Sequence, residues 1–114
     1  MEQRLPEEYE NKKIPVADGL GFAWDKETFL KFLSDSNTEI YAILGGDVLS
    51  QDPSSGSYKC TYDSWSINRD GPKEDFKEYC RRSRTKAIDY VSKYPATGST
   101  VFAPVLTSEV TAGL

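Results

Sequence analysis

The hydrophobic pattern of the chain predicts three β-strands. The most apolar run extends from Ile40 to Leu44 within residues 39–49, and it predicts a strand that is central in its sheet or covered on both faces. Apolar and polar residues alternate over residues 58–67, which is typical of a half-buried strand. A third apolar segment covers residues 99–107. We expect the first two strands to form a long antiparallel hairpin through the turn residues between them.

Apolar residues that recur every three or four positions predict two helices. The first covers about residues 26–36, where the Asp25 carboxylate can cap the amino end and Asn37 is a typical stop residue. The second begins near Pro72, since proline is favoured in the first turn of a helix. It ends before Pro95, because the residue that precedes a proline avoids the helical conformation. The second helix is therefore the longer of the two.

The remaining segments are short or polar. Residues 1–13 form a polar lead-in, in which a short helix is expected after Pro6. Residues 14–24 are expected to be extended, either as a lead-in or as a short edge strand. Residues 108–114 are expected to form a frayed tail. The chain has 114 residues without a repeat or a low-complexity block, so we expect a single domain over residues 1–114.

These elements predict an α+β fold, with a small antiparallel three-stranded sheet packed against one short and one long helix. If the long helix crosses back over the sheet, the third strand runs antiparallel to the first and can pair with it. The order across the sheet is then 2-1-3, with the strand of residues 39–49 in the centre. Pro104 has no backbone N–H to donate, so we expect it at a free sheet edge or at a bulge.

The composition excludes several classes of protein. The chain has no histidine, which excludes catalytic triads with a histidine base and zinc sites that contain histidine. No apolar run is long enough to span a membrane. The acidic amino terminus lacks the apolar stretch of a secretory signal. We therefore expect a cytoplasmic protein without a membrane partner.

The formal net charge is −4, from 14 lysines and arginines and 18 aspartates and glutamates. Such a surface repels a phosphate backbone, so nucleic acid is a disfavoured partner. The charge is uneven: residues 1–39 carry five basic and nine acidic side chains, whereas residues 70–94 carry seven basic and five acidic ones. Two interpretations stay open, a charged surface for a protein partner and an ordinary solvated acidic face.

The two cysteines, Cys60 and Cys80, have neither the spacing of a CxxC motif nor that of a zinc site. In a cytoplasmic protein we expect both to be reduced thiols in the core, and a disulfide between them is the less favoured alternative. We expect no metal site and no cofactor in this chain.

Gly45 and Gly46 precede Asp47 at the end of the most apolar strand. Two successive residues without a Cβ predict a bulge, a bend or a close approach by another backbone. In one interpretation the glycines present the Asp47 carboxylate to a basic group on a partner. In the other, Asp47 accepts hydrogen bonds from backbone amides of a bulge. The pattern favours neither.

Asp63 and Trp65 lie on the second strand of the predicted hairpin, and the expected register brings Asp63 near Asp47. Two neighbouring carboxylates can bind Mg²⁺ or Ca²⁺ or act as acid and base, but we do not expect so small a chain to form an enzyme's cleft. Trp65 is either a core residue or an aromatic anchor of an interface. With Asp52 in the hairpin turn, the candidate partner-binding residues are Asp47, Asp52, Asp63 and Trp65. None of them is expected to be catalytic.

Three arginines, Arg81, Arg82 and Arg84, lie close together on the predicted long helix. We expect them on a solvated face with local ion pairs, such as Glu78 with Arg82. Ser83 falls on the inner face of the same helix. We interpret Ser83 as a small packing residue, because the chain offers no base that would activate its hydroxyl group.

Several of these motifs together resemble immunity protein 40 of bacterial polymorphic toxin systems. The resemblance covers about residues 20–106, and its most specific parts are Gly45-Gly46-Asp47 and Tyr62-Asp63-Ser64-Trp65. It implies a small α+β protein that binds and neutralises a cognate toxin domain in the cytoplasm, with no cofactor. Our first hypothesis is therefore a stoichiometric inhibitor without enzymatic activity. The alternative is a non-catalytic regulatory or scaffold module that binds another protein.

Overall fold

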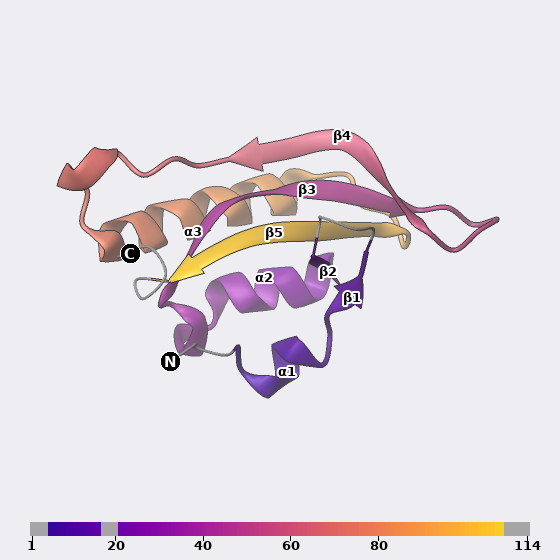
Figure 1. The fold of residues 1–114 in the computed structure, drawn as a ribbon, viewed down its shortest axis with the longest axis horizontal. Helices are drawn as coiled ribbons and strands as arrows, with labels where there is room; N and C mark the ends of the chain where they lie inside the picture. The colour runs from indigo at the N-terminus through magenta and orange to yellow at the C-terminus, as the bar shows by residue number, and fades with distance from the viewer. Residues whose placement is uncertain (1–4, 17–20, 109–114) are drawn as a thin grey trace.

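An antiparallel sheet of five strands organises the part of the chain that the computed structural model describes, residues 5–16 and 21–108. The strands are β1 (Ile14–Pro15), β2 (Phe22–Asp25), β3 (Tyr41–Gln51), β4 (Tyr58–Ser66) and β5 (Thr100–Ser108). Their order across the sheet is β1-β2-β5-β3-β4, so β4 is an edge strand (Figure 1). The long β3–β4 hairpin extends beyond the helices at one end of the molecule, as Figure 1 shows.

The predicted three-stranded sheet is therefore wrong. The three expected strands are β3, β4 and β5, and β3 does lie between the other two. The segment 14–24, expected as a lead-in or one edge strand, contributes β1 and most of β2 instead. β2 pairs with β5, where Trp24 lies opposite Phe102. One short edge strand was an expected alternative for this segment, but strands of two and four residues are too short for the pattern to separate, so only their tertiary pairing shows that there are two.

Pro104 lies in an interior strand, since β5 has β3 on one side and β2 on the other, but no β2 residue pairs with it. It lies opposite Gly46 of β3. The pairing between β5 and β2 extends only over Val101 and Phe102. The ladder with β2 therefore stops before it reaches the residue that has no N–H to donate.

The helices are α1 (Glu7–Glu10), α2 (Lys26–Ser34) and α3 (Phe76–Lys93). Asp25 caps α2 as predicted, since its side chain accepts a hydrogen bond from the Thr28 backbone amide at 2.7 Å. The helix ends before Asp35, whose backbone is extended, and a 3-10 turn, η1 (Ser36–Thr38), follows. The stop expected at Asn37 thus falls inside this turn.

The long helix α3 starts later than the predicted start at Pro72. A separate 3-10 turn, η2 (Gly71–Lys73), comes first, and the extended backbone of Glu74 separates it from the helix. Asp75 is the N-cap residue of α3, although its side chain makes no capping hydrogen bond. The helix ends at Lys93, ahead of Pro95, as predicted.

Tyr9 anchors the short helix α1 in the core. Its ring is 1% exposed, and its hydroxyl group donates a hydrogen bond to Asp35 Oδ2 at 2.6 Å. Its backbone carbonyl accepts a hydrogen bond from Trp24 Nε1 at 3.0 Å. Part of the lead-in predicted to be polar is therefore built into the fold. Of the tail predicted at 108–114, only Ser108 is described; it is the last residue of β5 and is buried.

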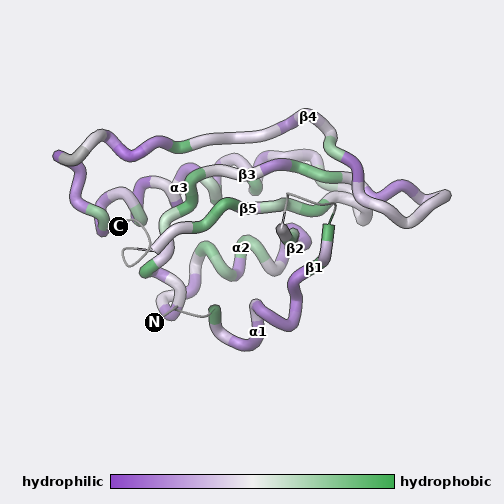
Figure 2. Tube along the Cα trace, in the orientation of Figure 1, coloured by the Kyte–Doolittle hydropathy of each residue, from purple (hydrophilic) through white to green (hydrophobic). Residues whose placement is uncertain are grey.

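α2 and α3 pack against the same face of the sheet. The buried residues of this core are Phe29, Phe32 and Leu33 from α2, Ala87 and Val91 from α3, and Tyr9, Trp24, Tyr41, Ile43, Val48 and Phe102 from α1 and the sheet. Burying one large apolar side chain contributes about 1.5–3 kcal/mol, so this interface is the main source of hydrophobic stabilisation. Figure 2 shows apolar stretches in β3 and β5 and mostly polar residues at the β3–β4 turn and ahead of α3.

The amino-terminal part of β3 has a helix beside it in place of a strand. β4 pairs with β3 only from Gly45 onward, which leaves the first residues of β3 without a strand on that side. Ser83 of α3 fills this place, because its Oγ accepts a hydrogen bond from the Ile43 amide at 3.0 Å. The expected packing residue is thus buried, and it also provides an acceptor for a backbone amide of β3 that has no strand partner on that side.

Arg84 is buried beside Ser83 and is 6% exposed, so the predicted solvated position is wrong for this arginine. Its guanidinium group lies over the Phe32 ring, with 5.3 Å between the guanidinium carbon and the ring centroid. It donates hydrogen bonds to the backbone carbonyls of Phe32 at 2.6 Å, Thr38 at 2.8 Å and Tyr41 at 3.2 Å. One side chain therefore joins the carboxyl end of α2, η1 and the start of β3 to α3.

No helix within the described ranges is long and apolar enough to cross a membrane.

Candidate protein-binding site

A bulge interrupts the edge strand β4 in its middle. Asp47 pairs with Ser64, but Leu49 pairs with Cys60, so one residue of β3 lies opposite three residues of β4. Those three are Thr61, Tyr62 and Asp63, and we call them the β4 bulge. Bulges end regular pairing and redirect side chains, and they are frequent at sheet edges and beside functional sites.

Local hydrogen bonds hold the β4 bulge in a fixed conformation. Thr61 Oγ1 donates to the Val48 carbonyl at 2.9 Å and accepts from the Asp63 amide at 3.2 Å. The Tyr62 amide donates to Cys60 Sγ at 3.3 Å. The backbone of Tyr62 has φ 71°, a left-handed conformation that residues other than glycine rarely adopt. Its side chain is 92% exposed, so the bulge points a large aromatic ring into solvent.

Asp63 follows Tyr62 in the bulge and is also exposed. Its Oδ2 accepts a hydrogen bond from the Tyr94 hydroxyl group at 2.6 Å, which joins the bulge to the end of α3. The same hydrogen bond raises the pKa of Tyr94. Within the described ranges no lysine or arginine forms an ion pair with Asp63. The carboxylate is therefore oriented by a neutral donor and keeps its charge open to a partner.

Trp65 lies behind the bulge, against the core. Its indole stacks on Tyr90 with 4.9 Å between ring centroids, and it also contacts Phe29. Its Nε1 is buried and has no hydrogen-bond partner in the described part of the chain. The structure favours the interpretation of Trp65 as a core residue, because its side chain is half-buried and packs between β4 and the helices.

The two glycines of β3 make room for Trp65. A Cβ on Gly46 would lie 2.5 Å from the Cη2 atom of the Trp65 ring, so the indole lies directly over this residue. A Cβ on Gly45 would lie 2.2 Å from the Trp65 carbonyl oxygen. The close backbone approach and the bulge predicted from the two glycines are both confirmed, since the β3–β5 pairing also shifts between Ile43 and Gly45.

Asp47 and Asp63 do not form the pair that the predicted register suggested. Val48 points into the core beneath the helices, so its neighbour Asp47 points to the opposite face of the sheet. Asp63 instead meets Tyr94 on the helix-covered face. Asp47 is half-buried, between Ser64 of β4 and Ala103 of β5. Within the described residues, no group of three or more acids or cysteines is arranged to hold a metal ion.

Asp52 stabilises the turn of the β3–β4 hairpin. Its Oδ1 accepts hydrogen bonds from the Ser54 hydroxyl group at 2.7 Å and the Ser54 amide at 2.9 Å. Its Oδ2 lies 3.0 Å from Lys59 Nζ. These contacts lower the pKa of Asp52 to about 2, with the Ser54 hydroxyl group as the largest cause. The turn uses the Asp52 charge internally, in contrast to that of Asp63.

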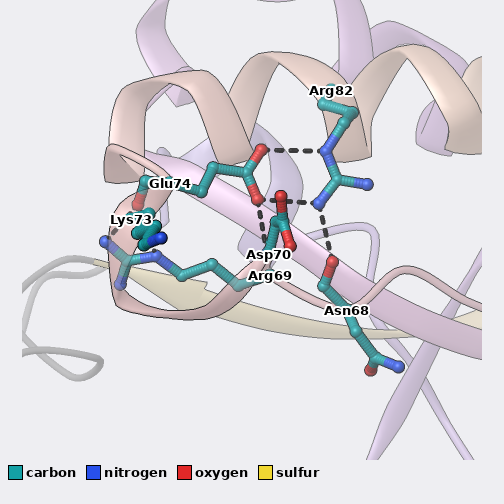
Figure 3. A pocket seen from close by; sticks show the side chains of 6 residues that line it. All are labelled: Asn68, Arg69, Asp70, Lys73, Glu74 and Arg82. Atoms are coloured by element: carbon teal, nitrogen blue, oxygen red, sulfur yellow. Dashed lines mark hydrogen bonds and ion pairs between the residues drawn. The ribbon is translucent and has the colours of Figure 1, made fainter.

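An open cleft of 630 Å³ lies at the amino end of α3, far along the helix from the bulge (Figure 3). Its centre is an ion pair in which Arg82 Nε and Nη2 each lie 2.8 Å from a different carboxylate oxygen of Glu74. Arg82 also donates to the Asn68 carbonyl at 2.6 Å. The predicted pair of Glu78 with Arg82 is thus wrong, because Glu78 pairs with Arg81. We interpret these contacts as structural, because they attach the loop before α3 to the helix.

The carboxylates of Asp52 and Glu74 predict a loss of stability in acid. The pKa of Glu74 is lowered to about 2 by Arg82 and the Asp70 amide, and that of Asp52 is also about 2. Their usual values are near 4, so their stabilisation is complete above the unfolded-state pKa and is lost as the pH falls towards 2. We expect the melting temperature to fall from pH 5 to pH 2.5. The double variant Asp52→Asn, Glu74→Gln should show a clearly smaller fall, and an equal fall would contradict this assignment.

The two cysteines do not form a disulfide with each other, and they lie in different environments. Cys80 is buried, as expected, whereas Cys60 is exposed on β4, so the core position predicted for Cys60 is wrong. The exposed position follows from the sheet order, because β4 is an edge strand.

Sequence reasoning missed two residues of the site, Tyr62 and Tyr94. The alternation of residues 58–67 placed Tyr62 in a regular half-buried strand, and the bulge turns it outward instead. Tyr94 lies at the predicted end of the long helix, directly before Pro95, and was not singled out as a site residue. No signal in the sequence marks its hydrogen bond to Asp63, since that contact joins residues 31 positions apart.

A comparison with protein families finds one match, to the family described as Immunity protein 40, over residues 11–106. No curated protein and no solved structure matches the chain.

Proposed function

Because the chain belongs to the immunity protein 40 family, we propose that it neutralises its cognate toxin by forming a stoichiometric complex with it. The family match over residues 11–106 carries this proposal, since it spans β1 to β4, α2, α3 and all of β5 except its last two residues. Inhibition would result from occlusion of the toxin surface and would need no chemistry on the toxin. The cytoplasm is the compartment in which such a complex would protect the cell.

The exposed edge of the sheet supports a protein partner. The β4 bulge presents an aromatic ring and a carboxylate from an edge strand, and aromatic residues are enriched at the energetic centre of protein interfaces. We propose that Asp63 contacts the toxin directly and that Trp65 holds the bulge in place from below. Asp47 lies on the same hairpin, and we propose that it adds to the negative field there. Asp52, whose charge is paired with Lys59, would support the site by holding the turn of the hairpin in shape. With a net charge of −4, this field would speed association with a basic toxin domain.

The alternative is a regulatory or scaffold module that binds a non-toxic protein through the same edge. The two hypotheses differ in one property of the partner, namely whether it kills or arrests a cell. Identity of the partner alone does not distinguish them, so the test needs a measurement of toxicity.

Co-expression tests the proposed function. The tagged chain is used to isolate a partner from its source organism, and the partner's carboxyl-terminal domain is then expressed in a bacterial host without and with the chain. We expect arrest of growth by the domain alone and normal growth when the chain is present. A partner that leaves growth unchanged would favour the regulatory module, and a toxic domain that the chain fails to neutralise would contradict the proposal.

A further inference from the structure

Neither the backbone conformation of Tyr62 nor the exposure of its ring contributes to the stability of the isolated chain. Its left-handed backbone, with φ 71°, is unfavourable for any residue with a Cβ, and its ring gains nothing from burial because it is 92% exposed. Glycine would adopt the same backbone without this cost. A tyrosine held at such a position points to a role outside the stability of the fold.

Asp63 adds a charge at the residue that follows Tyr62 in the β4 bulge. The Tyr94 hydroxyl group holds one carboxylate oxygen at 2.6 Å, so the side chain has a fixed orientation. No cation neutralises the carboxylate within the described ranges. An aromatic face and an unpaired carboxylate on adjacent residues together provide the two kinds of contact that a guanidinium group makes.

The bulge also limits how a partner can bind. A flat edge strand invites another strand to extend the sheet, but a bulge interrupts the row of backbone donors and acceptors that this pairing requires. Three residues of β4 opposite one residue of β3 make such an interruption in the middle of the edge. Recognition at this place therefore depends on side chains, chiefly those of Tyr62 and Asp63.

We propose that Tyr62 and Asp63 recognise an arginine side chain on the surface of the toxin. The guanidinium group would pair with the Asp63 carboxylate and stack on the Tyr62 ring, and Tyr94 acts as a positioning residue for the carboxylate. Arginine fits better than lysine, because its planar group both stacks on aromatic rings and pairs with carboxylates through parallel hydrogen bonds. This inference rests on the proposed function and names the chemistry of the partner at the same site.

Titration calorimetry with the toxin domain from the co-expression experiment, in a catalytically inactive form, tests the proposal. We expect Tyr62→Gly to weaken binding about 30-fold and Asp63→Asn about tenfold. Tyr62→Phe keeps the aromatic face and should stay within about threefold of the parent chain. The matched control is Asp75→Asn, which removes the same charge at the opposite end of α3 and should leave binding unchanged.

Thermal melting separates recognition from folding. Tyr62→Gly should melt at the same temperature as the parent chain or higher, because glycine relieves the left-handed backbone. Loss of affinity together with unchanged or higher stability is the result that the proposal requires. If Tyr62→Gly instead melts well below the parent chain, Tyr62 has a structural role and the proposal is wrong.

A double-mutant cycle tests the arginine itself. Surface arginines of the toxin are changed one at a time to lysine, and each variant is titrated against the parent chain and Asp63→Asn. We expect one position whose change weakens binding to the parent chain but has little effect on binding to Asp63→Asn. If no arginine couples to Asp63 while the parent chain still neutralises the toxin, this inference fails and the proposed function stands. If the parent chain itself does not bind the toxin, the proposed function fails, and this inference fails with it.

Discussion

Replacement of Gly45 by alanine is expected to lower the free energy of unfolding by about 3–5 kcal/mol. The new Cβ would lie 2.2 Å from the Trp65 carbonyl oxygen and 2.9 Å from the Ser66 Cα, and both are backbone atoms that cannot rotate away. The backbone at Gly45 also has φ 152°, which residues with a Cβ rarely adopt. The methyl group would therefore push β3 and β4 apart at the point where Trp65 enters the core. Urea unfolding, followed by far-ultraviolet circular dichroism, measures this loss.

Gly98→Ala is the matched control for Gly45→Ala. A Cβ on Gly98 meets no atom within 4 Å, and Gly98 does not have a positive φ of the kind that disfavours alanine. The free energy of unfolding of the Gly98→Ala variant should stay the same or rise by up to about 1 kcal/mol, because alanine restricts the conformations of the unfolded chain. Equal stability of the Gly45→Ala and Gly98→Ala variants would contradict the assignment of the two glycines of β3 to the close approach of β4.

Arg84→Met is expected to destabilise the fold by about 3–5 kcal/mol, although it replaces a charged residue with an apolar one of similar length. The substitution removes the guanidinium group that donates hydrogen bonds to three buried carbonyl groups, those of Phe32, Thr38 and Tyr41. It also removes the contact between the carboxyl end of α2 and α3. Chemical denaturation compared between Arg84→Met and the parent chain measures the effect.

The control for this substitution is Arg81→Met, three residues earlier on α3. The Arg81 side chain is 70% exposed and forms an exposed ion pair with Glu78, so its loss should change stability by less than about 0.5 kcal/mol. If both variants unfold at the same denaturant concentration, Arg84 does not have the structural role that its buried hydrogen bonds indicate.

Local signals in the sequence predicted the central part of the fold. The β3–β4 hairpin follows from the apolar run, the turn residues and the alternation after them, and the Asp25 cap predicts the start of α2. β1 and β2 could not be predicted in the same way, because strands of two and four residues have no readable period. Only their pairing with each other and with β5 makes them strands.

The spacing of residues along α3 indicates that Arg84 is buried, but its charge favoured the opposite interpretation. Arg84 follows Cys80 by four residues and precedes Ala87 by three, so it lies on the same inner face of α3. Its position within an arginine-rich segment favoured the interpretation as a solvated residue. The buried guanidinium group is stabilised because the carboxyl end of α2 supplies carbonyl groups that accept its hydrogen bonds. This arrangement depends on the tertiary structure, so the sequence pattern of α3 does not reveal it.

The candidate site was predicted in part. Asp63 is exposed on an edge strand, as an interface residue would be, and Trp65 lies directly behind it. Asp47 lies on the other face, because its partner across the β3–β4 ladder is Ser64 and not Asp63. A register difference of one residue moves a side chain to the other face of the sheet, and the sequence pattern does not fix the register of this hairpin. The exposed ring of Tyr62 is a product of the β4 bulge.

Titration of toxin activity tests the central claim most directly. The purified toxin domain is assayed at a fixed concentration, well above the dissociation constant, while the chain is added in increasing amounts. A stoichiometric inhibitor predicts a linear fall that reaches zero at one chain per toxin, with the toxin recovered unmodified from the complex. Full activity at equimolar chain, or complete inactivation at a small fraction of one equivalent, would contradict neutralisation by binding.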